Sequence, residues 1–172
     1  MMRSSAISLR QTGMVLLVSL VFLLMLSLIA LASMQGAVAQ QKMSGSVWHR
    51  NQSFQTAESG LRLGEAIVRK AAGTLPPCQS ISTCAPPQEA YAVVSGGANA
   101  ASAVTWVSVK GGVYGLQSLG RVDLPTAAPA ALYRVTAVGL NGQARTVLET
   151  VYARMDEGDG VRFRRILWRQ LQ

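Results

Sequence analysis

Residues 10–34 of this chain read RQTGMVLLVSLVFLLMLSLIALASM, and they predict a long apolar helix. Its last 21 residues, 14–34, are almost continuously apolar, and no charged residue occurs from Gln11 to Gln41. A helix of about 20 apolar residues is long enough to cross the hydrocarbon core of a bilayer. Arg3 and Arg10 precede the run and the first cation after it is Lys42, which predicts a cytoplasmic N-terminus and an exported remainder.

The bulk composition agrees with one membrane segment followed by one domain. The chain has 172 residues, of which 49% are hydrophobic and only 14% are charged, whereas soluble domains carry about 25% charged residues. Its net charge is +8, and 13 of its 16 cations are Arg. This bias is compatible with carboxylates, phosphates or a bilayer surface as partners, and charge alone selects none of them.

Two ordinary targeting segments compete for the apolar stretch. A secretory signal peptide would be cleaved after Ala39, because residues 37–39 satisfy the small-x-small rule. An uncleaved signal anchor is the second alternative. The apolar run argues against the signal peptide, since it exceeds the 7 to 15 residues of a usual hydrophobic region.

Gly13 is the last residue before the apolar helix, which has no break until Gly36. This arrangement resembles the type III signal sequence of type IV prepilins. The resemblance implies that a prepilin peptidase cuts between Gly13 and Met14 and that the new amine of Met14 is methylated. Glycine suits such a site because it tolerates an extended backbone and leaves room for a protease. Loss of the leader, which contains two arginines, would reduce the net charge from +8 to +6.

Val18 is the fifth residue counted from Met14, where most pilins carry Glu. A carboxylate inside a bilayer is costly and normally has a functional partner, which in pilins is thought to be the N-terminal amine of a neighbouring subunit. Some minor pilins and tip pseudopilins also lack this Glu. The resemblance therefore implies a low-copy subunit at or near the tip of a filament.

Helical periodicity continues beyond the apolar run. Glu58 with Arg62 and Glu65 with Arg69 form i,i+4 pairs in the favourable order, each contributing about 0.3 to 0.5 kcal/mol. The helix is expected to run from about Met14 to about Ala72, which is about 90 Å of helix. Small or apolar residues recur at spacings of three, four or seven, namely Val47, Phe54, Ala57, Leu61, Gly64 and Val68.

Residues 31–66, and above all the motif AESGLRLGE at 57–65, resemble the N-terminal signature of PilX-type minor pilins. The resemblance implies a minor pilin that primes type IV pilus assembly, sits at or near the tip and supports twitching motility and adhesion. Its partners would be other minor pilins, a tip adhesin, the prepilin peptidase and the inner-membrane assembly platform. A minor pseudopilin of type II secretion and a membrane-anchored periplasmic binding or assembly factor are the alternatives.

The loop PPCQSISTCAPP, residues 76–87, separates the helix from the rest of the chain, because its prolines exclude helix and central strand. Cys78 and Cys84 are expected to form a disulfide, since the region follows a membrane anchor and would reach an oxidising compartment. Free thiols are the alternative. A metal site is not expected, because the chain has no further Cys and His49 is its only His.

The segment after this loop predicts an antiparallel sheet. Asn141-Gly142 is a hairpin signal of the type I′ kind, and the Gly-rich residues 95–102 are expected to form a loop. Strands are expected at 91–94, 103–110, 112–116, 132–139, 144–154 and 161–168. The predicted fold class is α+β and pilin-like, with a long N-terminal helix packed on an antiparallel sheet. The expected parts are a leader at 1–13, a membrane or filament-core helix at 14–34, an amphipathic extension at 35–73 and a periplasmic head at 74–172.

Motifs of catalysis are missing from the sequence. It contains no GxSxG, HExxH or Walker loop, so neither an enzyme nor a cofactor is expected. His49 is interpreted as a surface or packing residue, and residues 156–160 as a turn instead of a calcium loop. Residues 162–170, RFRRILWRQ, are interpreted as an amphipathic final strand. A docking edge for another subunit and a nucleic-acid patch are its alternatives.

Overall fold

The computed structural model describes residues 12–71, 75–124, 127–157 and 160–172. These residues form the helix α1 (Thr12–Ala71), the short helix α2 (Ile81–Cys84), the 3-10 helix η1 (Gln88–Tyr91) and six strands. The chain divides into two compact units, one ending at Gly45 and one covering Ser46–Gln172. The second unit contains the last part of α1 and the whole sheet.

The helix α1 is continuous, as its periodicity predicts. No proline interrupts it, and Arg69 and Lys70 lie in its last turn, where cations interact favourably with the helix dipole. In the first unit its apolar side chains are exposed, with Met14 and Leu16 each 72% accessible. By length and composition, α1 is long and apolar enough to cross a membrane. It fits a single-pass membrane anchor.

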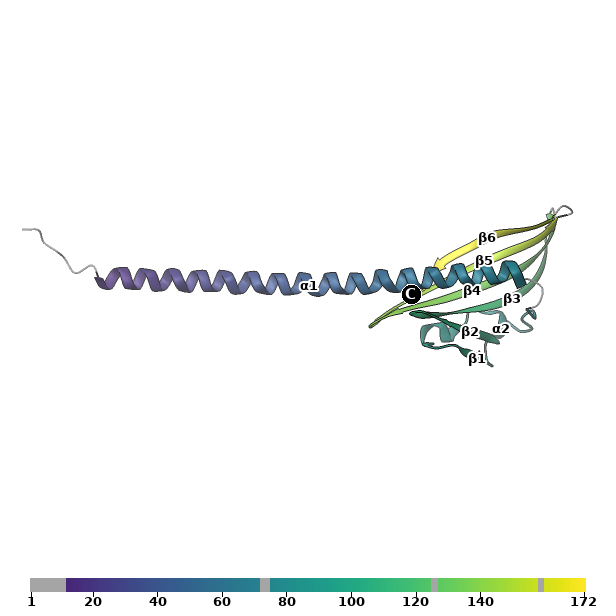
Figure 1. The fold of residues 1–172 in the computed structure, drawn as a ribbon, viewed down its shortest axis with the longest axis horizontal. Coiled ribbons are helices and arrows are strands. Elements are labelled where there is room, and N and C mark those ends of the chain that lie inside the picture. Colours follow the sequence, from purple (N-terminus) through teal and green to yellow (C-terminus); the bar gives the residue numbers. More distant parts are fainter. Residues whose placement is uncertain (1–11, 72–74, 125–126, 158–159) are drawn as a thin grey trace, which may run out of the picture. The chain divides into compact units, whose positions relative to one another are not determined.

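The sheet is an antiparallel meander, in which strands adjacent in the chain are adjacent in space (Figure 1). Each hydrogen-bonded neighbour pair is antiparallel. Together with α1, the meander confirms the α+β, pilin-like fold class. The strands are β1 (Gly97–Asn99), β2 (Val104–Val109), β3 (Gly112–Leu124), β4 (Ala127–Asn141), β5 (Ala144–Glu157) and β6 (Gly160–Gln170).

The first edge of the sheet differs from the prediction. Residues 91–94 form no strand: Tyr91 ends η1, and the carbonyls of Ala90 and Val93 accept hydrogen bonds from Arg145 instead of from a strand. Strand β1 lies inside the Gly-rich segment that was expected to be a loop. There Gly97 is paired with Trp106, and Gly96 lies so close to β2 that a Cβ would come within 2.9 Å of the Trp106 carbonyl oxygen.

The β4–β5 turn is also shifted by one residue from the predicted position. Asn141 pairs with Ala144, so Gly142 and Gln143 are the central residues. Gly142 has φ 57° whereas Gln143 has no positive φ. A type I′ turn needs positive φ at both positions, and a type II′ turn needs it at the first alone. The predicted hairpin is present, and its predicted turn type is wrong.

Both faces of the sheet are covered. On one face the second part of α1 packs Ala57, Leu61 and Val68 against a cluster that includes Leu148 and Tyr152. On the opposite face, Ala90 of η1 packs in a smaller cluster with Trp106, Val113, Val138 and Val147. Since side chains alternate along a strand, neighbouring residues such as Val147 and Leu148 serve different faces.

Candidate assembly surfaces

The motif at 57–65 lies in the part of α1 that packs directly on the sheet. A Cβ on Gly60 would lie 3.1 Å from the Cβ of Ala137, and one on Gly64 would lie 2.4 Å from Cγ1 of Val135. Glycine inside a helix is unfavourable by about 1 kcal/mol relative to alanine. Here its missing side chain allows the helix backbone to approach β4 closely, which accounts for two glycines in a helical segment.

Glu65, the last residue of the motif, links α1 to two strands. It accepts a hydrogen bond from Arg69 at 2.8 Å and another from the Tyr152 hydroxyl at 3.0 Å, and Arg165 of β6 lies 3.5 Å away. Partial burial acts to raise the pKa of Glu65, but these hydrogen bonds and the two arginine charges outweigh burial and lower the pKa below its usual value of 4.5. The predicted Glu58–Arg62 contact is also present, at 3.7 Å.

Glu149 of β5 is a buried carboxylate on the face of the sheet opposite α1. Its side chain is 0% exposed and lies between two arginines of neighbouring strands. Arg169 of β6 donates through Nε at 3.0 Å, and Nε of Arg134 on β4 lies 3.3 Å from the second carboxylate oxygen. The Arg134 contact is an ion pair without hydrogen-bond geometry. Burial lowers the pKa of Arg134, and the charge of Glu149 opposes that shift.

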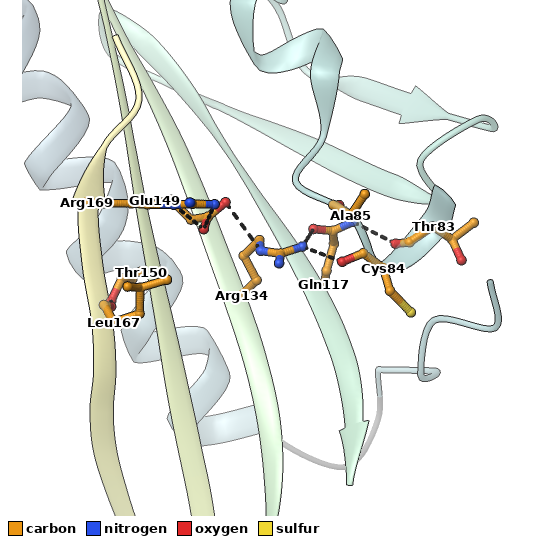
Figure 2. A network of polar contacts seen from close by, with 9 residues as sticks. All are labelled: Thr83, Cys84, Ala85, Gln117, Arg134, Glu149, Thr150, Leu167 and Arg169. Atoms are coloured by element: carbon orange, nitrogen blue, oxygen red, sulfur yellow. Dashed lines mark hydrogen bonds and ion pairs between the residues drawn. The ribbon is translucent and has the colours of Figure 1, made fainter. Parts of the chain in front are cut away.

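The polar contacts continue from Arg134 to the disulfide loop, as Figure 2 shows. Arg134 donates to the Cys84 carbonyl at 2.7 Å and to the Gln117 side chain at 3.2 Å. Gln117 in turn donates to the Thr83 carbonyl at 2.9 Å and the Ala85 carbonyl at 3.3 Å. One network therefore runs across β6, β5, β4 and β3 to α2.

Cys78 and Cys84 are bonded to each other in the structure, and their Cα atoms are 5.3 Å apart. The bond closes the loop that contains α2, whose N-cap Ser80 and Thr83 form a capping box. The backbone amide of Cys78 also donates to the Ser118 carbonyl of β3 at 2.8 Å. The loop is thus held both by the sheet and by its own cross-link.

Strand β6 contains the predicted amphipathic final strand and lies at the end of the sheet. All but one of its residues are exposed. Thr150 of β5 donates its hydroxyl to the Leu167 carbonyl, and the register shifts at Val151 and Tyr152, leaving Ile166 without a partner on β5. Residues 158–159 of the expected turn lie outside the described residues, while Glu157 and Gly160 on either side are paired.

The expected processing site lies at the start of α1. Gly13 and Met14 are helical, and nothing lies within 4 Å of a Cβ placed on Gly13. Val18 is also in the exposed apolar part of the helix. The basic leader residues Arg3 and Arg10 lie outside the described residues, so cleavage and methylation stay predictions.

No arrangement suited to catalysis is found in the described parts of the chain. Among them, no group of three or more His, Cys, Asp or Glu side chains could hold a metal ion. Nδ1 of His49 lies 2.6 Å from the side-chain oxygen of Asn141, so this histidine connects α1 to the β4–β5 turn. This agrees with its interpretation as a packing residue.

A long apolar helix whose final part is seated on an antiparallel sheet defines a pilin-like class of protein. Comparison with protein families gives the narrower assignment: residues 12–62 match the family described as PilX N-terminal. The match supports a type IV pilus minor pilin of the PilX type and confirms the resemblance in the N-terminal part of the chain. No match was found among curated proteins or among solved structures.

Proposed function

We propose that this chain is a minor pilin that primes type IV pilus assembly and occupies a position at or near the pilus tip. The observation that carries the proposal is the extent of the family match, residues 12–62. It includes the exposed apolar helix and most of the motif that seats α1 on the sheet. The match therefore covers the apolar helix and the beginning of the helix segment that packs on the sheet.

In this proposal the chain enters the inner membrane with its N-terminus in the cytoplasm and its head in the periplasm. Prepilin peptidase then cuts after Gly13, and Met14 is methylated. The apolar side chains of residues 14–34 are exposed in the isolated chain. They would pass from lipid into the filament core, because both surroundings shield them from water. Val18 supports a low-copy position, since this subunit lacks the carboxylate that pairs with a neighbour's amine in major pilins.

The proposed partners are other minor pilins, a tip adhesin and the inner-membrane assembly platform. No reaction is assigned to the chain. Adhesion and twitching motility depend on it indirectly, through the number of pili that are assembled.

Mass spectrometry of the mature N-terminus tests the processing step. The expected first residue is N-methylated Met14, and a Gly13→Ala variant is expected to retain the leader. An intact Met1, or a first residue of Gln40 after cleavage at Ala39, would contradict processing as a pilin.

Deletion of the gene tests the choice between the pilus and type II secretion. The expected result is loss of surface pili and twitching with normal secretion of exoproteins, restored by the unaltered chain. Normal twitching with lost secretion would contradict the proposal. Immunogold labelling is expected at filament ends, and even labelling along filaments would contradict the tip position.

A further inference from the structure

The two edges of the sheet are unequal. At one end β1 has only three residues, Gly97–Asn99, and short edge strands are one of the ways in which proteins prevent unwanted pairing. At the other end β6 has 11 residues, Gly160–Gln170. Within the described residues, β6 pairs only with β5, so the backbone groups of its second side are available to another chain.

The composition of β6 is that of an interface. Proteins commonly protect an edge with Lys, whereas the four cations of β6 are all Arg and the strand has no Lys, Asp or Glu. Interface cores are enriched in Arg and aromatic residues and depleted in Lys, Asp and Glu. Ile166, Leu167 and Trp168 are consecutive, and they are 52%, 40% and 44% exposed.

The strand is also held in place from both faces of the sheet. Arg169 is bound to the buried Glu149 on the face opposite α1 (Figure 2), and Arg165 lies near Glu65 on the helix side. A partner would therefore meet an edge that is already ordered, which lowers the entropy lost on binding. Arg164 pairs with Ala153 in the register and has no ion pair with a described residue, so its charge is available.

We infer that β6 binds an extended, carboxylate-rich segment of another protein by strand addition. The partner's backbone would pair with the free side of the strand, its carboxylates would face Arg164, and its apolar side chains would cover Ile166 and Trp168. A second copy of this chain fits less well, because each copy of β6 brings four arginines and no carboxylate to neutralise them. The inference does not depend on the proposed function.

Fluorescence polarisation tests this inference with the full-length chain in a nonionic detergent. The probe is a short labelled peptide of alternating Glu and Val, and its affinity is expected to fall as salt is raised. Two control peptides are matched to it. One replaces Glu by Gln, and the other carries N-methyl groups on alternate backbone amides, which prevent strand pairing.

Arg164→Glu is expected to weaken binding of the acidic peptide by about tenfold, because it replaces an attraction by a repulsion. Arg50→Glu is the matched control, since it makes the same charge change at an exposed position of α1 and is expected to leave affinity unchanged. Both variants are first compared by circular dichroism and thermal unfolding. The two control peptides keep the test valid even if a variant misfolds.

The inference is supported if the acidic peptide alone binds well and Arg164→Glu weakens it selectively. It is overturned if the acidic peptide does not bind, if the Gln or N-methyl peptide binds equally, or if both charge reversals have the same effect. Binding of single-stranded DNA without binding of the peptide would also overturn it, in favour of a nucleic-acid surface. Because no pilus is involved, these outcomes are independent of the twitching and secretion assays.

Discussion

At the scale of a single residue, Gly64 allows α1 to lie close to β4 of the sheet. A Gly64→Ala substitution is expected to reduce the free energy of unfolding by about 1 to 3 kcal/mol. The new Cβ would lie 2.4 Å from the buried, β-branched Val135, and this clash exceeds the gain of up to about 1 kcal/mol in helix propensity. Thermal and denaturant unfolding of the full-length chain in detergent measure the difference.

Gly45→Ala is the matched control for this substitution. Nothing lies within 4 Å of a Cβ at Gly45, so the change is expected to be neutral or stabilising by about 0.5 to 1 kcal/mol. Equal effects of the two substitutions would show that helix propensity, and not close packing, determines the stability of this segment.

Glu149 is the second residue with a large expected effect. Glu149→Gln is expected to destabilise the head by about 3 to 5 kcal/mol, because it leaves the buried charge of Arg134 without a counter-ion. Glu58→Gln removes an exposed pair and is expected to change stability by less than about 0.5 kcal/mol. Chemical denaturation separates these values, and a small effect of Glu149→Gln would contradict the role given to the buried network.

The sequence predicts local ion pairs and misses distant ones. The pairs of Glu58 with Arg62 and of Glu65 with Arg69 follow from helical spacing and are present. Glu149 and Arg169 are 20 residues apart, and their contact depends on the register of β5 with β6. Only the isolated Glu in the otherwise uncharged strand segment TVLETVYA, residues 146–153, could have signalled a buried carboxylate that needs a partner.

At the scale of elements, Glu65 connects α1 to β5 and β6, and the stability of this connection is expected to depend on pH. Its pKa is lowered in the folded chain, so its stabilisation is present above the usual value of 4.5 and is lost as pH falls through the lowered folded pKa. Unfolding free energies measured from about pH 6 to about pH 3 are expected to decline. Glu65→Gln should reduce the slope in the acidic range, by a modest amount because the carboxylate is partly exposed.

An unchanged slope in the Glu65→Gln variant would assign the acid sensitivity to other carboxylates. Asp156 pairs with Arg154 at 3.2 Å and is the natural comparison, because its side chain is 59% exposed. Asp156→Asn is expected to change the free energy of unfolding at neutral pH by less than about 1 kcal/mol, because the pair is exposed.

The disulfide loop is an element whose main effect is expected to be local. Replacing Cys78 and Cys84 by Ser together should lower stability by less than about 3 kcal/mol, since the closed loop is short. Amide hydrogen exchange is expected to accelerate at Cys84 and Ala85, whose amides donate to the Ser80 and Ile81 carbonyls. Unchanged exchange at these amides would show that the capping box and the sheet hold the loop without the cross-link.

At the level of elements, the sequence was most informative where the signal is local. Periodicity predicts α1 and alternation predicts β2 to β6, although β3 and β4 extend beyond the expected ranges. Strand β1 was missed because its Gly-Ala-Asn sequence has no strand propensity of its own and is ordered by pairing with β2. The turn at Gly142 was shifted because its position is set by the pairing of Asn141 with Ala144.

At the scale of the whole molecule, the boundary near Ser46 separates two kinds of surface. A fragment covering Ser46–Gln172 contains the sheet and the helix segment that covers it, and it is expected to be soluble and folded without detergent. The full chain is expected to remain in the membrane fraction after high-salt and carbonate washes, because its apolar helix is exposed.

Circular dichroism and analytical ultracentrifugation of the fragment, with membrane fractionation of the full chain, check this prediction. Aggregation of a fragment that lacks the apolar helix would show that the sheet needs further cover. Release of the full chain by carbonate would contradict membrane anchorage.

The close packing of α1 on β4 affects how the head responds to force. From Ala57 to Gly64, the helix contacts β4 first at Gly139, then at Ala137 and then at Val135. The helix therefore runs antiparallel to β4 along this contact. Tension applied along α1 would load these contacts in shear, all at once, instead of peeling them apart singly. Resistance to force depends on the rate of unfolding under load. This geometry is therefore expected to slow the unfolding of the head under tension, and single-molecule extension of the head would measure that rate.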